Sequence, residues 1–116
     1  MHFVEQHFDD VLVLAIKGKL IGSPETETLH DKVTEHLDNK IKNIVLDLKH
    51  VNWLSSMGIG AIMRCTMTVR TNGGDLRLTG LSDKVKNVLS ITQLVGVIQA
   101  YDSINDAIDS FRENEK

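Results

Sequence analysis

The chain of 116 residues has little of what marks secreted or membrane proteins. Its single cysteine, Cys65, excludes an internal disulfide and fits a reducing compartment. No apolar run approaches the roughly 20 residues that span a bilayer. The amino-terminal segment lacks the basic and apolar regions of a signal peptide. We therefore expect a cytoplasmic protein without direct membrane insertion.

A strong charge of one sign is also missing. The formal net charge is −3 and the lysines and arginines form no cluster, which argues against nucleic acid or an anionic membrane as the main partner. The contents of 41% apolar and 25% charged residues are ordinary for a globular protein. Because the sequence shows no repeat, low-complexity segment or linker, residues 1–116 are expected to form a single domain, with a core at about residues 3–112.

Residues that hold metals or nucleotides are sparse. The five histidines include no His-x-x-x-His pair and Cys65 has no cysteine partner, so we expect no metal site. Gly58-Ile59-Gly60 and Gly73-Gly74 lack the pattern of a nucleotide-binding loop, and no cofactor is expected. Gly58 and Gly60 are interpreted instead as close packing of a helix start, or as room for a partner's backbone.

Short apolar runs and helical repeats alternate along the chain. The apolar patterns predict strands at residues 3–8, 11–16, 44–48, 76–79 and 97–101, the fourth nearer the sheet edge. The helical patterns predict helices at about residues 24–38, 56–71, 83–92 and 103–111. The order β-β-α-β-α-β-α-β-α requires mostly parallel pairing after an antiparallel opening hairpin. We predict an α/β domain with one mixed, mostly parallel sheet of about five strands and about four helices.

The ends and buried faces of these helices also have local signals. Ser23 is predicted to cap the first helix, with Pro24 at its first position. Leu29, Val33 and Leu37 recur at four-residue spacing and predict its buried stripe. The third helix is predicted to start at Ser82 or Asp83, and the fourth at Ser103. Cys65 and Met63 are expected in or near the core, without a redox role.

Ser55-Ser56-Met57-Gly58 follows an apolar strand and opens a helix. Ser55 or Ser56 can cap that helix by accepting a backbone N–H. A capping hydroxyl can also accept phosphate, whose charge the helix dipole tolerates. A nucleophilic serine would need a base, and His50 and Asp47 are the nearby candidates. Because Gly-x-Ser-x-Gly is absent, a serine-dependent enzyme using Ser56 is only a distant alternative.

The order of these segments resembles a stand-alone STAS domain of the bacterial anti-sigma factor antagonist family. The resemblance covers nearly the whole chain. It includes the opening hairpin, Gly18-Lys19-Leu20, the strand Asn43–Leu48, the segment Val51–Gly60 and Gly73–Leu78. It continues from Val85 to Phe111. The resemblance implies the STAS fold and a regulatory protein rather than an enzyme.

The family's loop segment reads aromatic, aliphatic, Asp or Asn, Ser, Ser or Thr, Gly, aliphatic, Gly. Trp53 and Leu54 match its first two places, and Gly58-Ile59-Gly60 match its last three. In this register Ser55 stands at the Asp/Asn place and Ser56 at the first serine. Met57 then occupies the place of the residue that the family's partner kinase phosphorylates.

The resemblance implies a partner-switching protein that binds an anti-sigma factor with a kinase-like ATP fold and so frees a sigma factor. Met57 has no hydroxyl, which leaves three interpretations. The protein binds its partner constitutively, it is phosphorylated at Ser56 or Ser55 instead, or it serves as an interaction module in a stressosome-like scaffold or a transporter complex. The predicted partner-docking residues are Trp53, Leu54, Met57, Gly58, Ile59 and Gly60, although Trp53 could instead plug the core.

Overall fold

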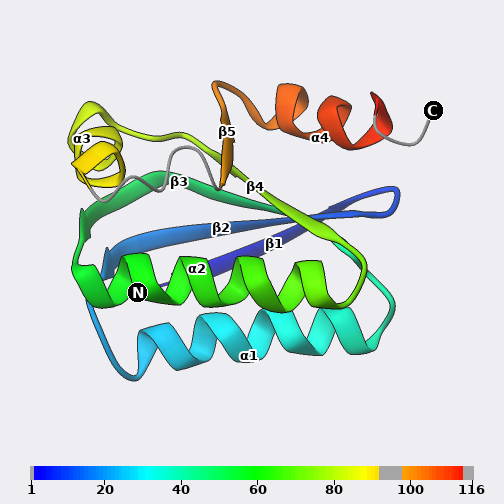
Figure 1. Ribbon diagram of the computed structural model, residues 1–116, viewed down its shortest axis with the longest axis horizontal. Coiled ribbons are helices and arrows are strands. Elements are labelled where there is room, and N and C mark those ends of the chain that lie inside the picture. The colour runs from blue at the N-terminus through cyan, green and yellow to red at the C-terminus, as the bar shows by residue number, and fades with distance from the viewer. Residues whose placement is uncertain (1, 92–97, 114–116) are drawn as a thin grey trace.

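Strands and helices alternate as the sequence predicts. The computed structural model describes residues 2–91 and 98–113, within which there are five strands and four helices (Figure 1). They are β1 (His2–Phe8), β2 (Val11–Leu20), α1 (Glu25–Asp38), β3 (Asn43–Leu54), α2 (Ser56–Thr71), β4 (Asp75–Thr79), α3 (Asp83–Ile91), β5 (Gln99–Tyr101) and α4 (Ile104–Glu113). The predicted α/β fold with a single mixed sheet is confirmed.

The sheet has the order β1-β2-β3-β4-β5. β1 pairs antiparallel with β2, through a turn in which Asp9 has a φ of 57°, and the remaining neighbours pair parallel. Each connection between parallel strands contains a helix. The chain must return to the starting end of the sheet before the next parallel strand can begin, and a tight turn is too short for that. The carboxyl ends of β2 and β3 therefore meet at one edge, where α2 begins.

Helices cover both faces of the sheet. α1 and α2 lie side by side against one face, and α4 packs over β3, β4 and β5 on the other (Figure 1). The predicted stripe of Leu29, Val33 and Leu37 is buried under α1, and Cys65 is fully buried under α2 with Met63 partly buried beside it. On the opposite face, Val11, Val13 and Val45 contact the buried side of α4. The strands between the layers are consequently apolar on both faces.

Two strands are longer than their apolar runs. β2 was predicted to end at Ile16 and β3 at Leu48, but their parallel pairing continues to Leu20 and Leu54. The register shifts between Ala15 and Lys17 and again further along, as at a β-bulge. Backbone hydrogen bonds between the two strands continue through this polar stretch. Such bonds leave no side-chain pattern, so the sequence does not indicate the extension.

Some of the predicted helix caps are confirmed and one is wrong. α1 begins at Glu25, after Pro24 at the cap position, so the prediction that Ser23 caps it and Pro24 is its first residue is wrong. Ser23 Oγ donates instead to Glu27 Oε1 at 2.6 Å. Ser82 caps α3 by accepting the Val85 N–H at 3.2 Å. Ser103 caps α4 in the same way, because its Oγ accepts the backbone N–H of the residue three positions later. The predicted Thr92 end and Val97 start lie outside the described residues.

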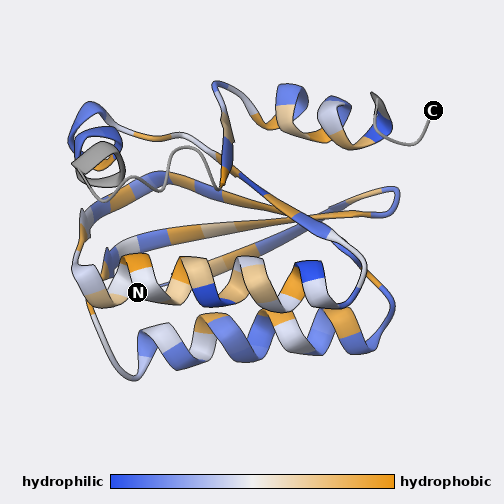
Figure 2. Ribbon diagram, viewed as in Figure 1, coloured by the Kyte–Doolittle hydropathy of each residue, from blue (hydrophilic) through white to orange (hydrophobic). Residues whose placement is uncertain are grey.

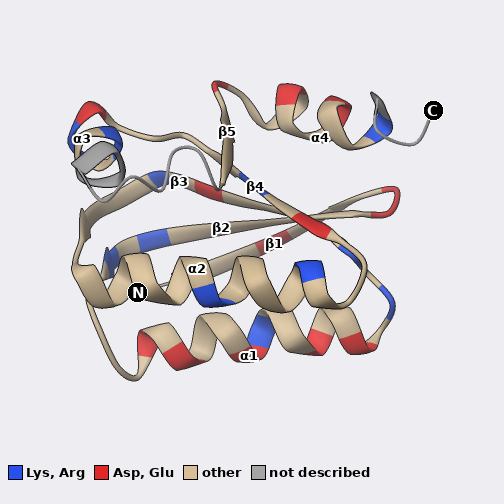
Figure 3. Cartoon of the chain, viewed as in Figure 1, with Lys and Arg blue, Asp and Glu red and all other residues tan. Residues whose placement is uncertain are grey.

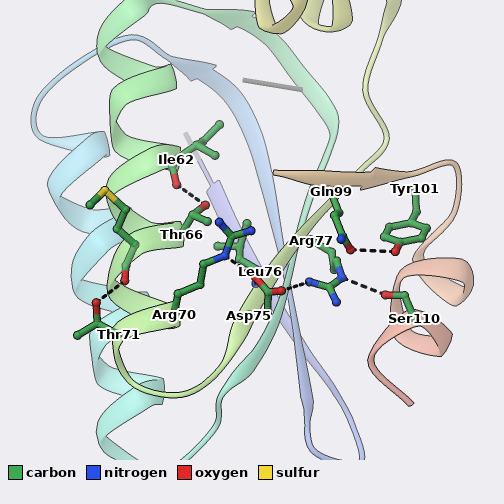
Figure 4. Close-up of polar contacts among 11 residues, drawn as sticks. Ile62, Thr66, Arg70, Thr71, Asp75, Leu76, Arg77, Gln99, Tyr101 and Ser110 are labelled. Carbon is green, nitrogen blue, oxygen red and sulfur yellow. Dashed lines mark hydrogen bonds and ion pairs between the residues drawn. The ribbon is translucent and has the colours of Figure 1, made fainter. Parts of the chain in front are cut away.

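β4 carries a buried charge that its pattern did not reveal. As predicted, β4 lies near the sheet edge, next to the edge strand β5, but all residues from Leu76 to Thr79 are buried, so it is enclosed on both faces. Arg77 is 1% exposed and its Nε donates to Ser110 Oγ of α4 at 3.1 Å. Its guanidinium pairs with the Asp75 carboxylate (Figure 4). The guanidinium also lies 4.5 Å from the centre of the Phe111 ring. Arg77 thus joins the sheet to the last helix.

Candidate docking site

Ser55 ties the end of β2 to the start of α2. Its backbone is extended, and its Oγ accepts the Gly58 N–H at 3.2 Å while donating to the Ile21 carbonyl at 2.8 Å. The Ser55 N–H also donates to the Leu20 carbonyl at 3.2 Å. The prediction of a serine cap is therefore confirmed for Ser55, whose hydroxyl is fully engaged.

The two glycines at this helix start have different environments. A Cβ added to Gly58 would lie 2.1 Å from the Leu20 carbonyl oxygen and 2.8 Å from Leu54 Cδ1, so only glycine lets α2 approach β2 this closely. A Cβ added to Gly60 would meet nothing among the described residues within 4 Å. Close packing thus explains Gly58, whereas room for a partner's backbone remains the interpretation for Gly60.

Burial separates the predicted docking residues into two groups. Trp53 is 46% exposed and Met57 is 59% exposed, and Ser56 and Gly60 are also exposed. The alternative in which Trp53 plugs the core is therefore wrong.

The other three predicted docking residues face inward. Leu54, Gly58 and Ile59 are buried, so the prediction that they form part of the surface needs correction. They face inward because Gly58 lies against Leu20 and the helix repeat directs Ile59 into the core. Their role is to support the exposed residues of the same turn.

A shallow groove extends from Met57 along the exposed side of α2. Its first part, about 170 Å³, lies between the helix starts, and its second, about 510 Å³, continues toward the end of α2; Gly60 and Arg64 line both. The docking groove, as we call it, is lined by Thr26, Glu27, Met57, Gly60, Ala61, Met63, Arg64, Met67, Thr68, Thr71 and Asn72. Met67, 65% exposed, is its most exposed large apolar side chain.

The charge of α2 suits a contact surface. The helix contains Arg64 and Arg70 but no acidic residue, and hydrophobic residues recur along it (Figures 2 and 3). Methionine side chains adapt to different partners because they are unbranched and polarisable. The docking groove thus combines adaptable methionine side chains with polar ones, and its lining contains one cationic residue, Arg64, and one acidic residue, Glu27. Met57, Gly60, Arg64 and Met67 follow three- and four-residue spacing, a second stripe that the sequence interpretation missed beyond Gly60.

Trp53 connects this surface to α3. Lys84 Nζ lies 3.9 Å from the centre of the Trp53 ring, close enough for a cation–π interaction. The pair spans the end of β3 and the first turn of α3. The exposed indole is therefore held in place at the margin of the site, which limits the entropy lost when a partner covers it.

The structure shows the surroundings of Asp47 and His50, the two candidate bases for Ser56. Among the described residues, the Ser56 hydroxyl has no hydrogen bond to His50 or Asp47. Asp47 Oδ1 instead accepts the Lys49 N–H at 3.1 Å and the Thr79 hydroxyl at 3.4 Å. His50 lies within β3. An exposed serine without a base at hand is a weak nucleophile.

The histidines have separate partners. His30 Nε2 lies 3.2 Å from Thr68 Oγ1, and His36 Nε2 lies 3.2 Å from Glu5 Oε2. Burial, with a smaller contribution from the Arg64 charge, lowers the pKa of His30. Over residues 2–91 and 98–113 no three metal-ligating side chains gather into a site.

Cys65 is expected to resist thiol reagents in the folded protein. Its side chain is fully buried, and burial raises the pKa of the thiol to about 12, so the reactive thiolate is scarce at neutral pH. Ellman's reagent at pH 8 should modify less than about a tenth of native protein during the time in which it modifies urea-unfolded protein fully. Equal modification rates in the two states would contradict the burial.

The fold and site define a class: a mixed-sheet α/β domain whose exposed apolar surface begins at a capped helix start. The chain belongs to the STAS domain family, whose model matches residues 2–107. A Thermotoga maritima protein named as an anti-sigma factor antagonist is 30% identical over 106 residues, which is 90% of this chain and 92% of the relative.

Solved structures agree with this assignment. The crystal structure of an anti-sigma factor antagonist from Thermotoga maritima matches with a TM-score of 0.85 at 27% identity, over 95% of this chain and 94% of that one. The unphosphorylated anti-sigma factor antagonist SpoIIAA shares the fold, with a TM-score of 0.74 at 18% identity, over 96% and 98% of the two chains. In the described part of the chain, no helix is both long enough and apolar enough to cross a membrane.

Proposed function

We propose that this protein is a non-catalytic anti-sigma factor antagonist of the cytoplasm. It binds an anti-sigma factor of the serine-kinase type, with a kinase-like ATP fold, through the docking groove, and so frees a sigma factor. Membership of the STAS family and the name of the Thermotoga maritima relative support the class of partner. The exposed Trp53 and Met57 support the place of contact.

Gly60 is the observation that carries the proposal. Glycine inside a helix destabilises it by about 1 kcal/mol relative to alanine. Gly60 is exposed, and within the described part of the chain no atom would meet its Cβ within 4 Å, so packing inside the protein does not require it. A partner whose backbone lies against the helix does require it, because glycine permits the closest approach.

The usual switch is missing at its usual place. Met57 cannot accept phosphate, and Ser55 would lose both hydrogen bonds of the cap if it were modified. Ser56 is exposed at the first position of α2, where the helix dipole would tolerate phosphate. We propose that Met57 acts as an apolar contact and makes binding constitutive; of the two serines before it, Ser56 is then the candidate for any residual phosphorylation.

Restoring a hydroxyl should restore the switch. In the presence of the anti-sigma serine kinases of the source cell and ATP, Met57→Ser is expected to take up phosphate and then lose at least about tenfold in affinity for the anti-sigma factor. The wild type and a Met57→Leu control should take up none and keep binding. Phosphopeptide mass spectrometry and calorimetric titration provide the two measurements.

Other outcomes discriminate between the alternatives. Phosphate on Ser56 of the wild type, with loss of binding, would contradict constitutive binding and assign the switch to Ser56. If no kinase-type anti-sigma factor binds even the unmodified protein, the proposed function fails, and an interaction module of a stressosome-like scaffold or transporter complex becomes the better interpretation. Hydrolase activity lost in Ser56→Ala would be needed to support an enzyme.

A further inference from the structure

β1 is an edge strand without the usual protection against pairing. It has seven residues, and its register with β2 runs from His2 to Phe8 without irregularity. Natural edge strands are commonly interrupted by proline, lysine, a bulge or a very short length. The opposite edge strand, β5, has three residues, whereas β1 contains neither lysine nor proline. Its outer edge is therefore able to accept another strand.

Exposed apolar side chains lie along the same strand. Val4 is 41% exposed and Phe8 is 40% exposed. Both face the side of the sheet on which α4 packs, since they pair with Ala15 and Val11 of β2. α4 lies over β3, β4 and β5, and its last turn reaches the β1–β2 turn, where Arg112 Nη2 donates to Asp9 Oδ2 at 2.8 Å (Figure 1). Both side chains nevertheless stay partly exposed beside the open edge of β1.

We propose that two copies of the chain associate through β1, paired antiparallel about a twofold axis at Gln6, so that the two sheets become one. Residues facing each other across such a pair lie on the same side of the sheet. With Gln6 at the axis, Val4 faces Phe8 of the second copy and Glu5 faces His7 of the second copy. Each contact occurs twice, because a twofold interface is self-complementary.

This register is favoured by charge and apolar matching. Moving the axis to Glu5 would place two carboxylates opposite each other, which is destabilising. Moving it to Val4 would place Phe3 against Glu5. Only the axis at Gln6 pairs apolar with apolar residues, an acid with an imidazole, and an amide with itself over residues 4–8.

The Glu5 carboxylate is kept ionised by its neighbours, which suits such a contact. Its carboxylate lies 3.7 Å from Lys32 Nζ and 3.2 Å from His36 Nε2, both on α1 of the same copy. Although burial opposes ionisation, these neighbours and His7 keep the pKa of Glu5 below its usual value. The His7 ring stays exposed, 5.5 Å from the His36 ring. A charged carboxylate is thus available to each His7.

The predicted interface is separate from the docking groove. β2 lies between β1 and β3, at whose end α2 begins. Two paired copies would therefore present two docking grooves at once. The contact involves little more than residues 4–8 of each strand, and an interface of that size is weak and transient. Association should consequently depend on protein concentration in the micromolar range or above.

Sedimentation velocity over a concentration series tests the association. The wild type should change from monomer to dimer, and Gln6→Lys, which places two ammonium groups at the axis, should weaken the dimer at least about tenfold. Gln6→Thr is the matched control, because threonine suits a strand and carries no charge; it should dimerise within about threefold of the wild type. A monomer at every concentration, or a dimer that Gln6→Lys leaves unchanged, would overturn the proposal.

Cysteine cross-linking tests the register. Opposed residues of an antiparallel pair have Cα atoms about 4.5–5.5 Å apart, within reach of a disulfide. Oxidised Gln6→Cys should give a covalent dimer, whereas Val4→Cys should not, because the two copies of residue 4 would lie about 13 Å apart. Buried Cys65 does not interfere. Cross-linking of Val4→Cys but not Gln6→Cys would contradict the register, whatever the outcome of the anti-sigma factor experiments.

Discussion

Gly58→Ala is expected to destabilise the protein by about 3 kcal/mol, at the upper end of the usual effect of overpacking. The new methyl group would lie 2.1 Å from the Leu20 carbonyl oxygen, a backbone atom that has no alternative rotamer. That carbonyl also accepts the Ser55 N–H, so a shift that relieves the clash pulls on the helix cap. Urea unfolding followed by circular dichroism measures the change in the free energy of unfolding.

Gly60→Ala is the matched control for Gly58. It should stabilise the protein by up to about 1 kcal/mol, because alanine is the better helix former and its Cβ meets nothing within 4 Å among the described residues. If the proposed docking is right, the same variant loses about tenfold in affinity for the anti-sigma factor. Equal stability changes in Gly58→Ala and Gly60→Ala would contradict the close approach of α2 to β2.

Asp75→Ala is expected to destabilise the protein by about 3 kcal/mol, because it leaves the buried Arg77 guanidinium without its carboxylate. The carboxylate also accepts Arg70 Nε at 2.9 Å and the Leu76 N–H at 2.8 Å (Figure 4). These contacts join α2, β4 and, through Ser110, α4. Thermal and urea unfolding of the variant should therefore show a loss spread over the whole domain.

Arg77→Met provides the control for the unpaired charge. Arg77→Met removes the buried charge itself and leaves an Asp75 carboxylate that is partly exposed and still paired with Arg70, so this variant should lose less than Asp75→Ala. Adding Arg77→Met to Asp75→Ala should recover stability, since no buried charge then lacks a counter-ion. A double variant that loses the sum of both single effects would contradict a coupled pair.

The contribution of Asp75 should also depend on pH. Burial opposes ionisation, but hydrogen bonds from Arg77, Leu76 and Arg70 keep the pKa of Asp75 below its usual value. A carboxyl whose pKa is lower in the folded state stabilises the fold fully above its unfolded pKa, near 4, and loses this contribution as pH falls through the folded value. The stability difference between wild type and Asp75→Ala should therefore be constant near neutrality and shrink on acidification.

Much of the architecture could be predicted from the chain because each element has its own local pattern. The stripe at Leu29, Val33 and Leu37 and the cap at Ser82 depend on neighbours within a few residues. The extension of β2 to Leu20 could not be predicted, since it comes from backbone pairing with β3. The burial of Arg77 could not be predicted either. Its place in an alternating strand is typical of an exposed residue, and it is buried because α4 packs over it.

The candidate site was also predicted only in part from the sequence. The segment from Trp53 to Gly60 was identified from its sequence, and the structure places it at a strand-to-helix junction with Trp53 and Met57 exposed. The sequence did not distinguish Gly58 from Gly60. Their difference arises from the Leu20 carbonyl, which belongs to another strand. The part of the docking groove that runs along α2 from Arg64 to Asn72 was found only once the exposed side of the helix was known.

By itself the sequence determined the order of strands and helices, the apolar residues of the core and the STAS resemblance, because these depend on local periodicity and on motifs read in one register. The same resemblance predicts that Met57, which has no hydroxyl, stands where the family has its phosphoacceptor. The tertiary structure alone decided that Gly58 is a packing residue, that Gly60 is open and that β1 is an uncovered edge. Those properties depend on contacts between segments distant in the chain, which no local pattern contains.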